Sequence, residues 1–93
     1  MSNREERIRQ ILTESFAPDA LDITDESGRH ANHAGRNGLP AGETHYHVAM
    51  VSPRFAGVAR VARARAVHEA LDAEFKAGLH ALSLTLRAPA EAA

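Results

Sequence analysis

Residues 44–65 of this chain, THYHVAMVSPRFAGVARVARAR, decide its fold because they pass from a strand pattern to a helix pattern. Apolar and other side chains alternate over residues 44–52, which predicts a strand, and Pro53 ends it. From residue 58 to residue 76 the apolar side chains recur at helical spacing instead, so a helix follows the strand. Six side chains form the stripe that is expected to face the sheet: Val61, Ala64, Val67, His68, Leu71 and Phe75.

Two elements are predicted before this stretch, a helix and a short strand. Residues 3–15 carry apolar side chains at helical spacing behind a capping box formed by Ser2 and Glu5. Apolar and polar side chains alternate over residues 21–24, which predicts a strand. Residues 26–43 contain four glycines and hardly any large apolar side chain, so a long loop is expected to connect the two strands.

A last strand and a tail follow the second helix. Gly78 is placed to terminate that helix, and leucines recur at every second position of residues 82–86, which predicts a strand. Residues 87–93 are rich in alanine and are expected to form a frayed tail. The first two strands are expected to be antiparallel, and the last two parallel because a helix connects them. The sequence thus predicts one α/β domain over residues 1–93, a three-stranded mixed sheet with helices on one face, ordered helix-strand-strand-helix-strand.

The composition excludes several classes of function. With 44% hydrophobic and 25% charged residues, the chain is expected to form one soluble domain with a modest core. A formal net charge of -1 argues against binding nucleic acid through bulk positive charge. We find no charged-then-apolar leader and no apolar run of membrane-spanning length, so we expect a cytoplasmic protein without membrane contact. No nucleophile-base pair, phosphate loop or pair of carboxylates indicates catalysis, so no enzyme is expected.

Histidine is unusually frequent, with six residues in a chain that has no cysteine. His30, His33 and His45 surround the glycine-rich loop, and His80 precedes the last strand. Imidazole is a common metal ligand, but a chain without thiolates has to borrow the sulfur of any soft-metal site. In the alternative interpretation, His80 is a hydrogen-bonded histidine at the edge of the core, and His30 and His33 are solvated loop residues. His45 and His47 are expected to line a face of the sheet.

The basic residues form one cluster around the start of the second helix, Arg54, Arg60, Arg63 and Arg65. Positive charge at the start of a helix opposes the helix dipole and forgoes roughly a few tenths of a kcal/mol per charge. This cost favours an anionic partner, such as an acidic protein surface or phosphates, and Phe55 is the nearby aromatic ring that is able to stack on a base. The alternative is a solvated face whose arginines pair locally.

Residues 55–65, FAGVARVARAR, resemble the signature of the BolA family, F-x-G-x-S-x-V-x-R-H-R. Further family landmarks follow in the right order, DES at 25–27, GETHY at 42–46 and GLHAL at 78–82. The resemblance covers nearly the whole chain and implies the KH-like (class II) BolA fold, which agrees with the predicted order of elements. The chain departs from the signature at Ala59, where the family has serine, and at Ala64, where it has histidine. This chain therefore cannot perform any role that the family histidine has at this position.

The resemblance implies a non-enzymatic adaptor that binds a monothiol glutaredoxin and shares a 2Fe-2S cluster with it, in iron-sulfur cluster trafficking or in iron and redox regulation. It further implies that the cluster is held by the glutaredoxin cysteine, glutathione sulfur and histidines of the BolA side. Those histidines match His80 and His30, and His33 is close enough in sequence to compete with His30. The isolated chain is expected to hold no cluster and to be a monomer or weak homodimer.

The alternative function is a BolA-type transcriptional regulator that binds DNA through the arginine-rich helix. The surface expected to bind a partner or nucleic acid consists of Arg54, Phe55, Gly57, Arg60, Arg63 and Arg65. Ala64 and the near-neutral charge weigh against DNA binding. A third alternative is a homodimer without a metal role, in which the loop histidines are inert.

Overall fold

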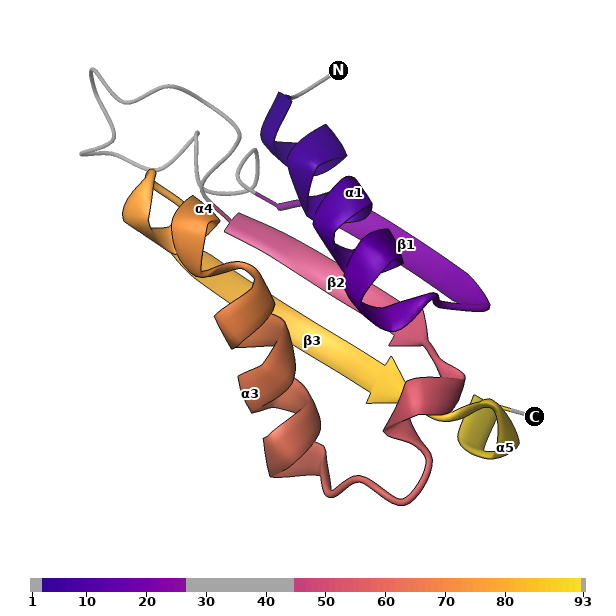
Figure 1. The fold of residues 1–93 in the computed structure, drawn as a ribbon. Coiled ribbons are helices and arrows are strands. Elements are labelled where there is room, and N and C mark those ends of the chain that lie inside the picture. Colours follow the sequence, from indigo (N-terminus) through magenta and orange to yellow (C-terminus); the bar gives the residue numbers. More distant parts are fainter. Residues whose placement is uncertain (1–2, 27–44, 93) are drawn as a thin grey trace.

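Three strands form one mixed sheet, and the longer helices pack against one of its faces (Figure 1). The computed structural model of the chain describes residues 3–26 and 45–92. Its elements are α1 (Asn3–Phe16), β1 (Ala20–Asp25), β2 (His45–Val51), the 3-10 turn η1 (Pro53–Phe55), α3 (Arg60–Ala70), α4 (Asp72–Lys76), β3 (Ala81–Arg87) and α5 (Pro89–Ala92). The predicted order of helix, strand, strand, helix and strand is confirmed. None of the helices within the described residues is long and apolar enough to cross a membrane.

The strand order is β1-β2-β3, so β2 lies in the centre of the sheet and β3 at one edge. β1 pairs with β2 in the antiparallel sense and β2 pairs with β3 in the parallel sense, as predicted. The segment between β2 and β3 carries α3 and α4, because parallel neighbours need a crossover connection. His45 of β2 lies opposite Ala81 of β3, so these two strands begin at the same end of the sheet.

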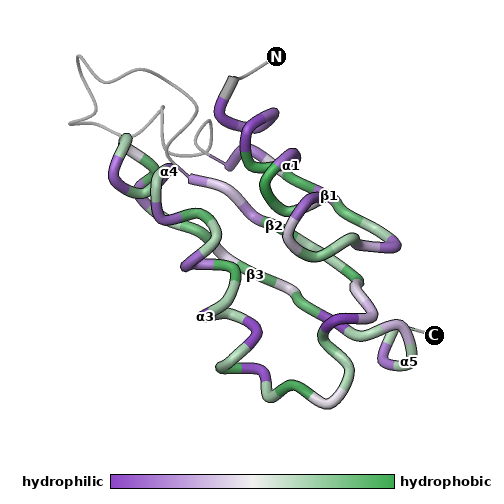
Figure 2. Tube along the Cα trace, viewed as in Figure 1, coloured by the Kyte–Doolittle hydropathy of each residue, from purple (hydrophilic) through white to green (hydrophobic). Residues whose placement is uncertain are grey.

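The core lies between the sheet and the helices. Tyr46, Val48 and Met50 of β2 share one face of the strand, as the alternation of the sequence predicts, and all three are buried. Three side chains of α1 recur at every fourth position and belong to the same buried cluster, Ile8, Leu12 and Phe16. Burial of side chains of this size contributes about 1.5–3 kcal/mol each. Figure 2 shows hydrophilic and hydrophobic residues following one another along α1, as a helix with one buried side requires.

The second predicted helix is shorter than expected and is divided into two. In place of one helix over residues 58–76, α3 begins at Arg60 and ends at Ala70, and α4 begins at Asp72. Leu71 interrupts the helix with φ -100° and ψ 15°, and its side chain is fully buried in the core. Leu71 belongs to the predicted apolar stripe, so the break between the two helices leaves this position in the core.

The buried side of α3 differs from the stripe that the sequence predicts. Val67 and Leu71 are buried as predicted, whereas Val61 is 70% exposed and His68 is also exposed. Arg63 takes a buried position four residues before Val67 and is only 5% exposed. The prediction for Val61 and His68 is wrong because the stripe is drawn mainly through apolar side chains. The buried side of α3 also contains an arginine, so it is rotated relative to the predicted stripe.

The C-terminal residues pack against the domain, so the prediction of a frayed tail over residues 87–93 is wrong for its described part. Arg63 Nη1 and Nη2 donate to the two carboxylate oxygens of Glu91 in α5 at 2.6 and 3.2 Å. The backbone N–H of Ala88 donates to Glu91 Oε1 at 2.7 Å. An alanine-rich segment has no hydrophobic periodicity from which this docking could be predicted.

Candidate functional site

His80 is exposed at the end of the turn that leads into β3. Its ring centroid lies 5.3 Å from that of His45, the first residue of β2, and the two ring planes are inclined by 52°. The parallel register explains this pair, because His45 lies opposite Ala81 and His80 directly precedes Ala81. Two imidazoles far apart in sequence therefore meet at one end of the sheet.

The histidine pair supplies nitrogen donors without completing a metal site. Within residues 3–26 and 45–92, no group of three or more histidine, aspartate or glutamate side chains is placed to hold a metal ion. Imidazole nitrogen suits iron, zinc, copper and nickel, and a full coordination sphere needs further ligands from outside the pair.

The backbone and a small cavity define the surroundings of the pair. The backbone N–H of Glu26 donates to the carbonyl oxygen of His45 at 2.8 Å, which ties the end of β1 to the start of β2. A cavity of about 160 Å³ borders His45, and its lining also includes Glu26, Ala81 and Ser83. The backbone of His45 is therefore held by β-sheet pairing at the end of the sheet where the cavity lies.

His47 and His68 are engaged in other contacts. His47 Nδ1 and Ser83 Oγ are hydrogen-bonded at 2.7 Å, and His47 Nε2 lies 3.4 Å from Thr85 Oγ1. These contacts between β2 and β3 lie on the face of the sheet away from the buried Tyr46, Val48 and Met50, as predicted for His47. His68 stacks on Phe75 at a centroid distance of 5.1 Å. Both rings thus have structural partners.

Of the three predicted metal ligands, the structure describes one. His80 is placed as stated above, whereas His30 and His33 lie outside the described residues, and their role stays a prediction. Sequence reasoning did not name His45 as a neighbour of His80. The signal that identifies it is the predicted parallel pairing, since two parallel strands that begin at the same end bring the residues at their starts together.

The predicted basic cluster is divided between the surface and the interior. Arg54, Arg60 and Arg65 are exposed, and Arg54 Nη1 donates to the carbonyl oxygen of Ser15 at 2.9 Å. Arg63 is buried, and besides Glu91 it donates from Nε to the carbonyl oxygen of Val58 at 2.7 Å and from Nη1 to that of Leu86 at 3.1 Å. Its guanidinium therefore connects α3, β3 and α5, and its charge is paired with Glu91 of the same chain.

Phe55 and Gly57, the other predicted members of this surface, occupy the connection between β2 and α3. Phe55 is buried, its ring centroid lies 5.3 Å from that of Phe16, and the Arg63 guanidinium carbon lies 5.7 Å from its ring centroid. A base has no access to this ring, so its role is packing. Gly57 is exposed and has φ +74°, a backbone conformation that favours glycine in the turn before α3.

A cavity of about 510 Å³ lies along α3 and β3. Its lining includes Arg60, Arg63, Ala64, Leu86, Arg87 and Glu91. Ala64 stands where the signature quoted above has a histidine, so a short side chain borders this space. The cavity and the histidine pair are formed by different parts of β3, because one involves its C-terminal half and the other its start.

Comparisons with known proteins agree with this geometry. A family described as BolA-like protein matches residues 12–91. UV-induced protein uvi31 of Schizosaccharomyces pombe is 41% identical over 83 residues, which cover 88% of this chain and 81% of that protein. The solved structure of BolA1 from Arabidopsis thaliana is similar with a TM-score of 0.85 and 42% identity, covering 98% of this chain and 97% of that one. The BolA domain of SufE1 from Arabidopsis thaliana also has a TM-score of 0.85, with 38% identity and 98% of each chain covered. These similarities confirm the predicted fold.

Proposed function

Because the chain belongs to the family of BolA-like proteins, we propose that it is a non-enzymatic adaptor that binds a monothiol glutaredoxin and shares a 2Fe-2S cluster with it. The observation that carries the proposal is the exposed imidazole of His80 beside His45, which presents nitrogen donors where a partner protein reaches them. Similarity to the BolA domain of SufE1 supports an iron-sulfur related role. The adaptor serves cluster trafficking or iron and redox regulation, in the cytoplasm.

The donor set of the chain matches a shared cluster better than a resident one. Iron-sulfur clusters are held by thiolates, and this chain has no cysteine. Membership of the BolA-like family implies that the sulfur ligands come from the glutaredoxin cysteine and from glutathione, and we expect the isolated chain to hold no cluster. Histidine in place of cysteine on one iron raises the reduction potential of such a centre, so the adaptor changes the chemistry of its cargo.

Each candidate histidine has a distinct part in this proposal. His80 is the first ligand, because its ring is exposed at the end of the sheet. His30 supplies the second nitrogen, with His33 as its competitor. His45 is a further candidate, since its ring already lies against that of His80.

Replacement of His80 tests the proposal directly. We expect the chain to change the visible circular dichroism of a glutaredoxin that carries a glutathione-ligated 2Fe-2S cluster, because imidazole and thiolate differ in charge and donor strength. His80→Ala should abolish that change and leave the far-UV spectrum of the chain intact. His68→Ala is the matched control, since His68 is exposed but stacks on Phe75.

The same titration ranks the remaining candidates. We expect His30→Ala to weaken the mixed cluster more than His33→Ala does, and His45→Ala measures the contribution of the second described imidazole. An unchanged response in folded His80→Ala would remove His80 from the ligands, and a cluster reconstituted on the isolated chain would contradict the need for borrowed sulfur.

DNA binding by a BolA-type transcriptional regulator is the second candidate function. One observation favours it, the arginine-bordered cavity of about 510 Å³ along α3 and β3. Two placements weaken it, because Arg63 is bound internally and Phe55 is buried. The adaptor function is therefore the one that this geometry supports best.

A further inference from the structure

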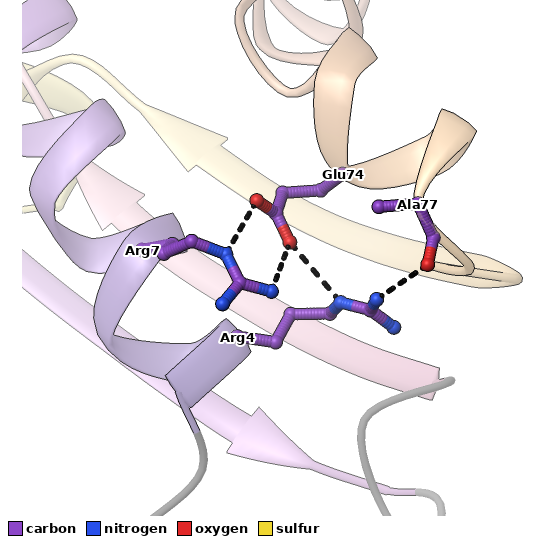
Figure 3. A network of polar contacts seen from close by, with 4 residues as sticks. All are labelled: Arg4, Arg7, Glu74 and Ala77. Atoms are coloured by element: carbon purple, nitrogen blue, oxygen red, sulfur yellow. Dashed lines mark hydrogen bonds and ion pairs between the residues drawn. The ribbon is translucent and has the colours of Figure 1, made fainter.

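A buried carboxylate on α4 is held by two arginines of α1 and has no part in the proposed cluster site. Glu74 is 5% exposed, and its Oε1 accepts from Arg4 Nε at 3.1 Å and from Arg7 Nη2 at 3.0 Å. Its Oε2 accepts from Arg7 Nε at 2.8 Å. Figure 3 shows both guanidinium groups directed from α1 at this carboxylate, so ion pairs connect the first turns of α1 to α4.

Arg4 extends this contact to the turn that follows α4. Its Nη2 donates to the carbonyl oxygen of Ala77 at 2.9 Å (Figure 3). The same guanidinium packs against Gly78, where an added Cβ would lie 3.3 Å from Arg4 Nη2. Gly78 has φ +124°, a conformation open to glycine and strained for other residues. One side chain of α1 therefore holds both α4 and the reversal of the chain after it.

The main chain of Glu74 fixes the same turn from the other side. The carbonyl oxygen of Glu74 accepts from the backbone N–H of Leu79 at 2.9 Å. The side chain of Leu79 is buried in the core, and His80 is the next residue. A continuous set of contacts thus leads from α1 through Glu74 and Leu79 to the backbone of His80.

α4 depends on these contacts because it is only five residues long. A helix of this length is not stable by itself, so tertiary interactions decide its position. The hydrogen bond from Arg7 lowers the pKa of Glu74, burial opposes this, and the hydrogen bond from Arg4 lowers it further. Glu74 is therefore ionised at neutral pH, and its buried charge makes loss of either arginine costly.

We propose that Arg4 and Glu74 are positioning residues for His80: they hold the 77–79 turn so that the imidazole remains beside His45 and is presented to the partner. As a statement about the ligand of a shared cluster, it rests on the proposed function. The placement of the 77–79 turn itself is independent of that function and is measurable in the isolated chain.

Two conservative substitutions separate charge from geometry. Arg4→Lys keeps the positive charge, but a single ammonium group cannot reproduce the fork that reaches Glu74 and the Ala77 carbonyl together. Glu74→Gln keeps the shape and removes the charge. Asp72→Asn is the control on the same helix, since it breaks the exposed Asp72–Lys76 pair. Glu91→Gln is the control for a lost ion pair to a buried arginine elsewhere in the molecule.

Hydrogen exchange and ring contacts in the isolated chain report the position of the turn. In Arg4→Lys and Glu74→Gln we expect the Leu79 amide to exchange about tenfold faster or more, because its acceptor is then no longer held in place. The nuclear Overhauser contact between the His45 and His80 rings should weaken in the same two variants. Their response in the circular dichroism titration with cluster-loaded glutaredoxin should shrink, whereas both controls retain the Leu79 protection and the ring contact.

The outcomes separate positioning from simple stabilisation. Equal acceleration of Leu79 exchange in Glu91→Gln and Arg4→Lys would overturn the proposal, since the network would then act through global stability alone. An unchanged Leu79 amide and ring contact in Arg4→Lys would overturn it as well. If Glu74→Gln does not fold, Arg4→Lys decides, because it retains the charge. The two proposals can also fail separately. If Arg4→Lys accelerates exchange of the Leu79 amide, while His80→Ala leaves the circular dichroism response of cluster-loaded glutaredoxin unchanged, the positioning role is supported and the cluster function is refuted.

Discussion

Ala59 is a single residue whose identity weakens the start of α3. It occupies the position before the first turn with φ -62° and ψ 149°, and no side-chain hydrogen bond caps the helix there. The BolA signature has a serine at this position, and serine is among the best residues for capping a helix N-terminus. The helix that carries Arg60 and Arg65 therefore begins with uncapped N–H groups on its exposed side.

Restoring the serine should stabilise the protein. We expect Ala59→Ser to raise the free energy of unfolding by about 1 kcal/mol, because the hydroxyl accepts from an N–H of the first turn. Urea denaturation followed by far-UV circular dichroism measures the change. Ala62→Ser in the exposed part of α3 is the matched control and should lower the stability slightly, since serine is a poorer helix former than alanine. Equal effects of the two substitutions would show that no cap forms.

Arg63 shows the opposite case, a residue of the signature with an internal role. Its guanidinium donates four hydrogen bonds inside the domain, to the carbonyl oxygens of Val58 and Leu86 and to the two oxygens of the Glu91 carboxylate. The sequence predicted a surface arginine because charged side chains are mostly exposed. No local pattern indicates a partner 28 residues further along the chain.

At the scale of elements, α5 depends on one carboxylate. The hydrogen bond from Arg63, followed by that from the Ala88 amide, lowers the pKa of Glu91 from 4.5 to about 2. α5 has only four residues, and its attachment to α3 runs through this side chain. The docking of the C-terminal segment is therefore expected to be pH-dependent.

The pH dependence has a definite sign. Because the pKa of Glu91 is lower in the folded protein than in the unfolded chain, its ionised form stabilises the fold above pH 4.5, and this contribution disappears as the pH falls toward about 2. Urea denaturation should show Glu91→Gln less stable than the unmodified protein at pH 7, with the difference vanishing near pH 2. The control is Glu69→Gln on the exposed side of α3, for which we expect a much smaller difference at pH 7. A Glu91→Gln difference that is constant with pH would contradict the ion pair.

At the scale of the whole molecule, the chain separates its two candidate surfaces. The helices cover one face of the sheet, and the histidine pair lies at the end where β2 and β3 begin. Exposed arginines lie on η1 and α3, which connect the opposite end of β2 back to β3. A partner at the histidines and an anion at the arginines would therefore bind different regions.

DNA binding, if it occurs, should be weak and steeply salt-dependent. With Arg63 internal, the exposed Arg54, Arg60 and Arg65, together with Arg87 at the cavity, neutralise about four phosphates, so the slope of log affinity against log salt should be about -4 or shallower. Arg60→Ala together with Arg65→Ala should reduce that slope by about 2 for all sequences alike. Fluorescence anisotropy with two unrelated duplexes measures this. Sequence-selective, nanomolar binding at physiological salt would instead favour the transcriptional regulator.

The sequence by itself determined the elements whose signals are local. Alternation over residues 44–52 identified which side chains share a face of the strand, and helical spacing did the same for α1, because a side chain's direction follows from the period of its own element. The connection through a helix determined the parallel pair, and the signature around Phe55 identified the family. His80 was recognised as a candidate from its motif alone.

Only the tertiary structure decided the contacts between residues distant in sequence. Arg63, Arg4 and Glu74 are buried charged residues, and each is paired with a charge 28 to 70 residues away in the sequence. The neighbourhood of His45 and His80 is likewise decided by the tertiary structure, through the register of β2 and β3. Burial of a charge is favourable only once its partner is in place, and the partner's position is a property of the folded chain as a whole.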